Sequence, residues 1–589
     1  MSEPARRTRS PIPHRRGEHP APARRWVLSA CLLIAAPAFA HDLVFRDGFQ
    51  PVTDAPASDA EAGRFLAMAT FGPKAADIAH LRAVGRAQWI EQQLSLPPQL
   101  QRPTVEASVI AANGEPPGQR ARLEIWMRNA ITAPDQLRQR VAWALSQVFV
   151  TTTLQGKLAN DPSALAELYD HFARHAGGWV DDTGIAHAGT YASLLHDVTR
   201  SPAMAKMLSY LRNRVGDPVL GTSPDENYAR EVLQLFSIGL VLRQADFSPI
   251  VDADGVPLPT YGQATVSAYA RVFTGWSYQS GFASNPLGPN YAPAAYLPLA
   301  CTPQVHDMAA KTLLDYDGDE GAGGAITLPA GNGCANDLVD GLQVIAQHPN
   351  VGPFIARQLI QRLTTSNPSP AYIARVVAKF EDDGRGRRGD IGAMVTAILI
   401  DPEVATDAPA PLPPRVFGKA REPLLKLTAL YRRYDARSTT GSYERVNYAA
   451  YQQVPQGAPS VFNYYLPDYQ PPGELAASGL FAPELQIVNE SSVFAAANDL
   501  LTQLENALGK PGNTDLTIAV DLSPLLPLAD DPAQLVARVD GDLLYGRMSA
   551  PMRATLESMV AALPAANPSR RVRSLLQVVL ASPEFAIQK

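Results

Sequence analysis

The sequence has few cysteines, few aromatic residues and no apolar run long enough to span a bilayer. Its 589 residues include 3 cysteines, 7% aromatic and 18% charged residues, against 46% hydrophobic ones. This balance excludes collagen-like, coiled-coil and wholly disordered chains. The most apolar stretch, Trp26–Phe39, covers 14 residues, whereas a spanning helix needs about 20. The mature chain is therefore predicted to be a globular protein with no membrane span.

Several catalytic signatures are also absent. The chain has no Gly-x-Ser-x-Gly elbow, no Walker phosphate loop and no complete dinucleotide fingerprint. These absences argue against serine esterases, nucleotide hydrolases and Rossmann oxidoreductases. No fixed-period repeat is present, which argues against a solenoid. The residues alone assign neither a reaction nor a cofactor.

Positive charge is concentrated at the start of the chain. Residues 1–40 carry seven arginines and two glutamates, so removing them changes the formal net charge from -6 to -11. An acidic body lacks the basic surface that phosphate-driven nucleic-acid binding requires. No nucleic-acid partner is therefore expected.

The same forty residues have the organisation of an export signal. Arg24 and Arg25 precede the apolar stretch, and Ala38-Phe39-Ala40 supplies the small residues of a cleavage site. We expect a signal peptide over 1–40, a linker over 41–59 and a periplasmic or secreted protein. The arginine pair also fits a loose twin-arginine pattern, and Leu28–Cys31 resembles a lipoprotein box, so the export route stays open.

Cleavage after Ala40 would leave two cysteines, Cys301 and Cys334. An even pair in an exported chain is typical of a disulfide bond, and this is the predicted state. The alternative is a pair of separate buried thiols.

Hydrophobic residues recur at helical spacing from about residue 60 onward. Leu137, Val141, Leu145 and Val148 are an example, and strand-like alternation is scarce. The predicted fold class is mainly α, a large multi-helix domain with long Pro/Gly-rich loops and little β. It is expected to cover 60–589, with a helical N-terminal half to about 435 and a helical C-terminal half from about 436. Further helices are predicted over 60–70, 84–95, 162–175, 188–198, 264–275, 336–347, 370–381, 390–400, 417–434, 484–508, 530–541 and 549–563.

One predicted helix has an unusual polar face. Ser223-Pro224-Asp225-Glu226 has the spacing of a capping box, and Gly239 is a reasonable end. Its polar side presents Glu226, Asn227, Arg230 and Glu231 at spacings that allow pairing, cation binding or proton transfer. The alternative is a capping glutamate followed by a solvated row of charges.

This helix also carries a family resemblance. Pro224–Glu231, followed by Gln234–Gly239, closely resembles the signature of the bacterial family called domain of unknown function 1800. The resemblance spans most of 60–589 and implies no reaction, because the family has no settled activity. It implies an envelope partner of the domain of unknown function 1501 type, by analogy alone. Supporting motifs are Leu137–Ser146, Asp197-Val198-Thr199, Ser201–Met204, Phe273–Trp276, His306-Asp307 and Ala458–Asn463.

The chain departs from this family at positions where many members carry histidine. Ser146, Gln147 and Phe236 stand there instead. A family-wide metal or haem site built on those histidines is therefore not expected in this protein.

Two histidine patterns remain. His171 and His175 lie four residues apart on a predicted helix, the spacing that lets two imidazoles meet one metal ion, although the glutamate of a zincin motif is missing. His306 and Asp307 follow Cys301 in a long loop, where a histidine beside a carboxylate can serve as base or ligand. Ordinary surface packing and loop hydrogen bonding are the alternatives.

Two loop segments also attract attention. Asp315, Asp317 and Asp319 alternate as in a calcium loop, but the glycine and the final glutamate of an EF-hand are missing. The aromatic tract Phe462–Pro472 is expected to fill the core between helices, with stacking on a sugar or a partner as the alternative.

Two hypotheses follow. In the first, the protein is an envelope enzyme in which Glu231 or Glu226 acts as acid, base or ligand, Arg230 and Asn227 orient it, and His306 and Asp307 approach across a cleft. In the second, it is a non-catalytic envelope assembly or binding protein whose polar face is a buried network.

Overall fold

The computed structural model describes residues 54–111, 118–155, 158–279, 295–316, 324–404, 417–438, 441–443, 448–505 and 518–589. The predicted leader, most of the linker, and Asp317 and Asp319 of the calcium hypothesis lie outside these residues. Residues 53–589 form one compact unit. Its division into two helical halves near residue 435 stays a prediction.

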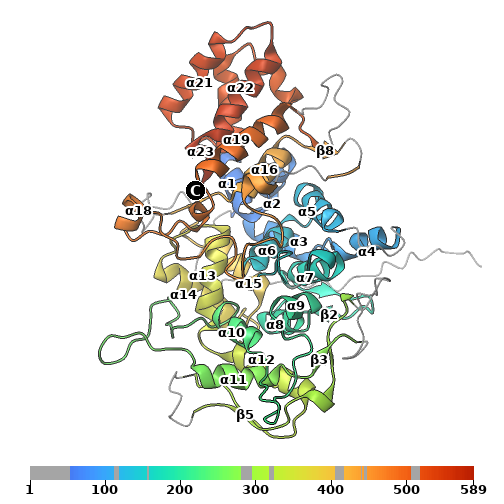
Figure 1. Cartoon of the computed structure of the whole chain (residues 1–589). Helices are drawn as coiled ribbons and strands as arrows, with labels where there is room; N and C mark the ends of the chain where they lie inside the picture. The colour runs from blue at the N-terminus through green and yellow to red at the C-terminus, as the bar shows by residue number, and fades with distance from the viewer. Residues whose placement is uncertain are drawn as a thin grey trace, which may run out of the picture. The chain divides into compact units, whose positions relative to one another are not determined.

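Helices dominate the described residues, as predicted (Figure 1). The α-helices up to residue 272 are α1 (Asp59–Ala69), α2 (Ala75–Val84), α3 (Arg86–Ser95), α4 (Arg102–Ala111), α5 (Arg120–Thr132), α6 (Gln136–Ser146), α7 (Pro162–His175), α8 (Tyr191–Thr199), α9 (Pro202–Met207), α10 (Asn227–Gln234) and α11 (Gln263–Val272). Those that follow are α12 (Cys334–Gln347), α13 (Val351–Leu363), α14 (Pro370–Glu381), α15 (Ile391–Leu399), α16 (Pro423–Arg433), α17 (Tyr448–Tyr451), α18 (Glu474–Ala477), α19 (Glu490–Glu505), α20 (Pro532–Val539), α21 (Ala550–Ala562), α22 (Pro568–Ala581) and α23 (Pro583–Ala586).

Shorter elements fill the connections. The described strands pair as small antiparallel sheets: β1 (Trp179–Val180) with β2 (Ala186–His187), β3 (Trp276–Ser277) with β4 (Ala300–Cys301), β5 (Lys311–Thr312) with β6 (Thr327–Leu328), β7 (Lys419–Ala420) with β10 (Ile587–Gln588), and β8 (Arg437–Ser438) with β9 (Ile518–Ala519). The 3₁₀ turns are η1 (Leu158–Asn160), η3 (Pro303–Val305), η4 (Pro483–Gln486) and η5 (Ser523–Leu528), and η6 (Asp540–Leu544) is a π-helical turn. Within the described ranges, no helix has both the length and the apolar character needed to cross a membrane.

The centre of the unit is α6, which is buried on every side. The four apolar residues that predicted this helix are at most 3% exposed, but its polar residues are buried as well. Helices α1, α3, α5, α7 and α13 surround it. The apolar spacing in the sequence is that of a helix with one buried face, whereas α6 is buried on all faces. Its buried polar groups therefore need hydrogen-bond partners inside the protein.

A buried glutamate at the start of α16 supplies the main set of partners. Glu422 accepts hydrogen bonds at Oε2 from the indole of Trp143 (2.8 Å), from Gln147 (3.0 Å) and from Gln453 (3.0 Å). The cations Arg140 and Lys419 lie 3.8 and 3.9 Å from Oε1. These contacts join α6 to segments almost 300 residues later in the chain.

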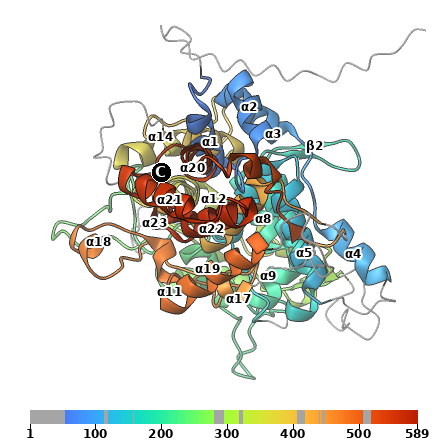
Figure 2. The same ribbon diagram turned by 90° about the horizontal axis from the view of Figure 1, so that it is seen from above.

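The end of the chain returns to the middle of the unit. Strand β10 pairs with β7, and the side-chain amide of Gln588 donates to the carbonyl of Leu363 at 2.7 Å. Helices α19 and α21 both pack on α22, and the three lie at one end of the described unit (Figures 1 and 2).

The aromatic tract lies partly in the core. Tyr464 and Tyr465 are buried, and Tyr465 donates a hydrogen bond to Gln147 at 2.8 Å. Phe462 is 49% exposed. Core filling therefore accounts for the two tyrosines but not for Phe462.

The predicted disulfide between Cys301 and Cys334 is present. It joins β4 to the first turn of α12 and closes a loop in which the cysteines are 33 residues apart. Within that loop, the His306 imidazole and the Lys311 ammonium meet Asp337 of α12 at 2.9 and 2.6 Å. The covalent bond and the buried ion pairs hold the same two segments together.

Replacing both cysteines with serine is expected to lower the free energy of unfolding by about 3 to 4 kcal/mol, because the unfolded chain regains the entropy of an open loop. Urea unfolding of the oxidised protein and of the double variant measures the difference. The wild-type protein in reductant should match the variant. Equal unfolding midpoints for the oxidised protein and the variant would contradict a stabilising bridge.

Candidate functional site

The predicted polar helix begins later than its sequence indicates. Helix α10 starts at Asn227 with Glu226 at the N-cap, and the capping box expected from Ser223 is wrong. Residues 217 and 222 pair across a tight turn, so the chain is still leaving that turn at Ser223. Asp225, one residue before the N-cap, accepts the backbone N–H of Asn227 at Oδ1 with a distance of 2.9 Å.

Glu226 joins α10 to α11. Its carboxylate accepts hydrogen bonds from Ser267 (2.6 Å), Gln263 (2.8 Å) and Arg230 (3.3 Å). The bond from Ser267 is the main cause that lowers the pKa of Glu226 below its ordinary value. An ionised carboxylate with both oxygens engaged is suited to holding two helices together rather than to accepting a proton.

Glu231 differs from Glu226. Its Oε2 is buried and has no hydrogen-bond partner among the described residues. The buried hydroxyl of Tyr261 also lacks a hydrogen-bond partner among them. Burial raises the pKa of Glu231, with the charge of Arg230 opposing. Burial also raises the pKa of Tyr261 to about 12. Within the predicted polar face, Glu231 is the carboxyl group with an unengaged oxygen, whereas Asn227 donates to Ser209 at 3.3 Å.

His306 and Asp307 are held by the protein interior. The Nε2 of His306 faces Asp337 at 2.9 Å, and Nδ1 faces the carbonyl of Thr274 at 2.9 Å. Asp307 pairs with Arg271 through two bonds of 2.7 and 3.0 Å. The side chain of His306 is fully buried with both ring nitrogens engaged. This placement orders the loop and leaves the imidazole no free nitrogen for a substrate.

Glu226 of the polar helix and Asp307 of the loop both bind side chains of α11, at successive turns. Gln263, Ser267 and Arg271 lie four residues apart along α11; the first two bind Glu226 and the third binds Asp307. No hydrogen bond or ion pair links Glu226 or Glu231 to His306 in the described part of the chain. The structure therefore brings the groups to one face of α11 in separate contacts, and the catalytic roles stay predictions.

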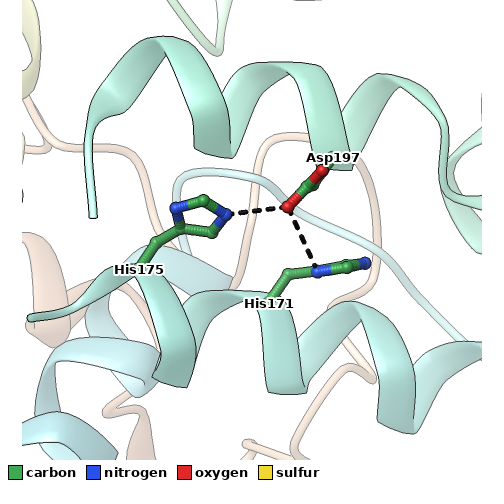
Figure 3. Close-up of side chains that lie close together, drawn as sticks. All are labelled: His171, His175 and Asp197. Carbon is green, nitrogen blue, oxygen red and sulfur yellow. Dashed lines mark hydrogen bonds and ion pairs between the residues drawn. The ribbon is translucent and has the colours of Figure 1, made fainter. Parts of the chain in front are cut away.

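A third group comes from α7 and α8. His171 and His175 occupy adjacent turns of α7, and Asp197 of α8 points toward both (Figure 3). Asp197 Oδ2 lies 2.9 Å from His175 Nε2 and 3.5 Å from His171 Nδ1. One ligand atom from each residue lies within 4.8 Å of the other two. Ligand atoms around a tetrahedral zinc ion lie about 3.3 Å apart, so small side-chain rotations would complete such a site.

His175 has an outer hydrogen-bond partner, and His171 has a carboxylate nearby. His175 Nδ1 is 3.2 Å from the hydroxyl of Ser193, and His171 Nε2 is 4.0 Å from Glu167. Glu167 is itself paired with Arg174 and Arg102 at 2.7 and 2.5 Å. Metal-binding histidines in proteins show this arrangement, in which the second ring nitrogen faces a polar partner.

The protonation states also suit a cation. Burial lowers the pKa of His171 and of His175, so both imidazoles are neutral at pH 7. Burial alone would raise the pKa of Asp197, but the hydrogen bonds from His175 and His196 and the nearby imidazoles outweigh it and leave the pKa well below its ordinary value. His171 Nδ1 is buried and has no hydrogen-bond partner. Neutral imidazoles and an ionised carboxylate are the forms that bind metal ions.

The hairpin β1–β2 fixes the position of His175. Gly189 passes so close to the carbonyl of His175 that any side chain there would collide with it. The ring of Trp179 meets the His175 ring edge-on at 4.6 Å and stacks on His187 at 4.7 Å between centroids. Gly189 therefore packs against the backbone of His175, and Trp179 packs against its ring.

Sequence analysis found the two histidines of this cluster but not its carboxylate. In the sequence, Asp197 is the first residue of one of the supporting family motifs. Its distance along the chain from His171 and His175 gives no sign that α8 packs against α7. At two of the positions where the family resemblance leads us to expect histidine, Gln147 binds Glu422 and Phe236 packs against Phe149 with ring centroids 5.5 Å apart. These positions belong to the core in this protein.

A family model described as "Protein of unknown function (DUF1800)" matches residues 64–587. No curated protein and no solved structure matches the chain.

The unengaged carboxyl of Glu231 makes a testable prediction. A raised pKa in the folded protein means that ionisation costs stability as the pH rises above the ordinary glutamate value. Glu231→Gln removes that charge, so the variant should melt at a higher temperature than wild type at pH 8 and at the same temperature at pH 4. Thermal unfolding at both pH values measures this, with Glu226→Gln as the control, which should melt lower at pH 8. A Glu231→Gln variant less stable at pH 8 would show that the carboxylate has a stabilising partner.

Proposed function

The chain belongs to the DUF1800 family, and from that membership and the geometry of α7 and α8 we propose that it is an exported metal-binding protein whose ion is held by His171, His175 and Asp197. The observation that carries the proposal is the convergence of three ligand atoms within 4.8 Å of one another. The hydrogen bond between Ser193 and Nδ1 of His175 supports it, because it orients that ring with Nε2 toward Asp197.

The donor set favours a transition metal. Two imidazoles and one carboxylate suit zinc and also iron(II), whereas calcium and magnesium prefer oxygen ligands alone. We propose zinc, because three protein ligands and one open position complete a tetrahedral site. Three protein ligands leave a fourth position for water or a substrate, as in catalytic zinc sites. Held by His171, His175 and Asp197, zinc would supply a bound water with a pKa of about 7 and a Lewis acid for a carbonyl or phosphoryl oxygen. We therefore propose metal-assisted hydrolysis as the class of reaction.

A second candidate is a non-catalytic assembly protein in the envelope. The contacts of Glu226, His306 and Asp307 favour it, because all three side chains are engaged in holding segments together. In that case the metal would stabilise the packing of α7 on α8, and the partner would be another envelope protein, such as one of the domain of unknown function 1501 type.

Metal content tests the proposal directly. The purified protein should bind one zinc ion per chain, and Asp197→Asn and His171→Gln should each weaken binding at least about 10-fold, because each removes a ligand. Isothermal titration calorimetry and elemental analysis measure affinity and stoichiometry. His80→Gln is the matched control, since it removes an exposed imidazole that contacts Gln92 and lies outside the three-residue cluster. The proposal fails if the wild-type protein binds no zinc or if the ligand variants bind as well as the control.

Export is tested separately. The proposed leader supports cleavage after Ala40, so the protein recovered from the periplasm or medium should begin at His41. N-terminal sequencing measures this. Replacing Arg24 and Arg25 with lysine distinguishes the routes, because twin-arginine export should be blocked and general secretion should continue. An uncleaved chain retained in the cytoplasm would contradict export.

A further inference from the structure

Far from the histidine cluster in the sequence, two arginines and two phenylalanines form an alternating stack. The guanidinium carbon of Arg243 lies 4.0 Å from the centroid of the Phe247 ring, and that of Arg357 lies 4.8 Å from the same centroid. Arg357 also lies 5.2 Å from the centroid of Phe481. Arg243 and Phe247 belong to the connection between α10 and α11, Arg357 to α13, and Phe481 to the loop before η4.

Local hydrogen bonds make the stack rigid. The backbone N–H of Arg243 donates to Asn350 at 2.7 Å, and the side chain of Asn350 in turn donates to the carbonyls of Ile238 and Val241, both at 2.7 Å. One guanidinium nitrogen of Arg243 donates to the carbonyl of Phe247 at 2.9 Å. The turn that carries Phe247 is therefore fixed against the start of α13.

Neither arginine forms a salt bridge with the described residues. The described residues include no hydrogen-bond acceptor and no ion-pair partner for the Arg357 guanidinium, whose contacts are the two rings. The exposed Asp468 raises the pKa of Arg357 by charge–charge attraction, without a hydrogen bond or a salt bridge to it. Both guanidinium carbons lie within 5 Å of one ring centroid, so they are at most about 9 Å apart.

Both arginines keep their charge at neutral pH. Burial lowers the pKa of Arg357 to about 10, with Asp468 opposing and with Arg243 and Arg362 adding to the effect. A positive charge that is partly buried beside another positive charge, in a chain of net charge -6, costs free energy unless an anion offsets it. The aromatic rings supply part of that offset through cation–π attraction, worth about 0.5 to 2 kcal/mol for each contact.

We propose that the edges of Arg243 and Arg357 bind a phosphate-bearing ligand. Each guanidinium carbon lies close to a phenylalanine ring, and Arg243 uses one nitrogen for the carbonyl of Phe247. The remaining N–H donors can match phosphate oxygens in pairs. A separation of up to about 9 Å suits a diphosphate with one phosphate group on each guanidinium. The phosphate could be carried by a soluble molecule or by the headgroup of an anionic lipid, since both present the same oxygens.

Pyrophosphate and inorganic phosphate are the first probes. Calorimetric titration of the full-length mature protein should show saturable binding of pyrophosphate that sodium chloride of equal ionic strength does not reproduce. Arg357→Met, which keeps the apolar stem between the rings, should weaken binding at least 10-fold. Arg243→Met should do the same and serves as the second variant if Arg357→Met does not fold. Arg385→Met, which removes an exposed positive charge outside the stack, should bind as wild type.

Sedimentation with vesicles distinguishes the two sources of phosphate. Binding to vesicles that contain phosphatidic acid, lost in Arg357→Met and absent with phosphatidylcholine alone, would support a lipid headgroup as the ligand. Binding of free pyrophosphate without vesicle binding would support a soluble phosphate compound. The proposal is overturned if neither probe binds, or if Arg357→Met and Arg243→Met both fold and bind as wild type, in which case the stack serves only to fasten the turn to α13.

Discussion

The constraint on which the structure depends is the complete burial of α6. A helix enclosed on all sides takes its polar side chains into the core, where an unpaired charge is far more costly than a paired one. The carboxylate of Glu422 pairs with several of these side chains. It accepts hydrogen bonds from Trp143 of α6 and from Gln147 directly after it, and Arg140 lies 3.8 Å away. Because Glu422 precedes α16, the pairing fixes how late segments of the chain lie against early ones. The core is thus specified by polar partners as well as by apolar packing.

The same helix positions the histidine cluster. Arg138 of α6 donates to the carbonyls of Ala173 and Arg174 at 3.2 and 3.3 Å, and it also reaches the carbonyl of Leu94. A guanidinium at the C-terminus of a helix satisfies carbonyls that have no partner within the helix. Helix α7 is therefore anchored at the end that carries His175, and α8 packs against it with Asp197 facing inward. By contrast, Glu226, His306 and Asp307 are engaged in contacts that hold α10, α11 and α12 in place.

Much of the secondary structure could be predicted from sequence because periodic apolar residues report burial directly. The segments over 162–175 and 370–381 are helices with those bounds, and the mainly helical class, the disulfide and the family are all confirmed. Helices α5 and α22 were not predicted. The capping box at Ser223 failed because a neighbouring turn takes precedence over local capping chemistry. Asp197 could not be assigned to His171 and His175 because tertiary packing, and not spacing along the chain, brings α8 to α7. For the same reason, the hydrogen bond from Gln147 to Glu422, which lies 275 residues later in the chain, could not be predicted from the sequence.

We place the functional centre between α7 and α8 and not on the polar face of α10, as proposed above. Anomalous diffraction at the zinc edge, from crystals of the protein grown with zinc, tests this placement. We expect one strong anomalous peak bonded to His171, His175 and Asp197, at about 2.0 to 2.2 Å from each ligand atom. A crystal that shows no peak there, or that shows its peak at Glu226 and Glu231, would contradict it.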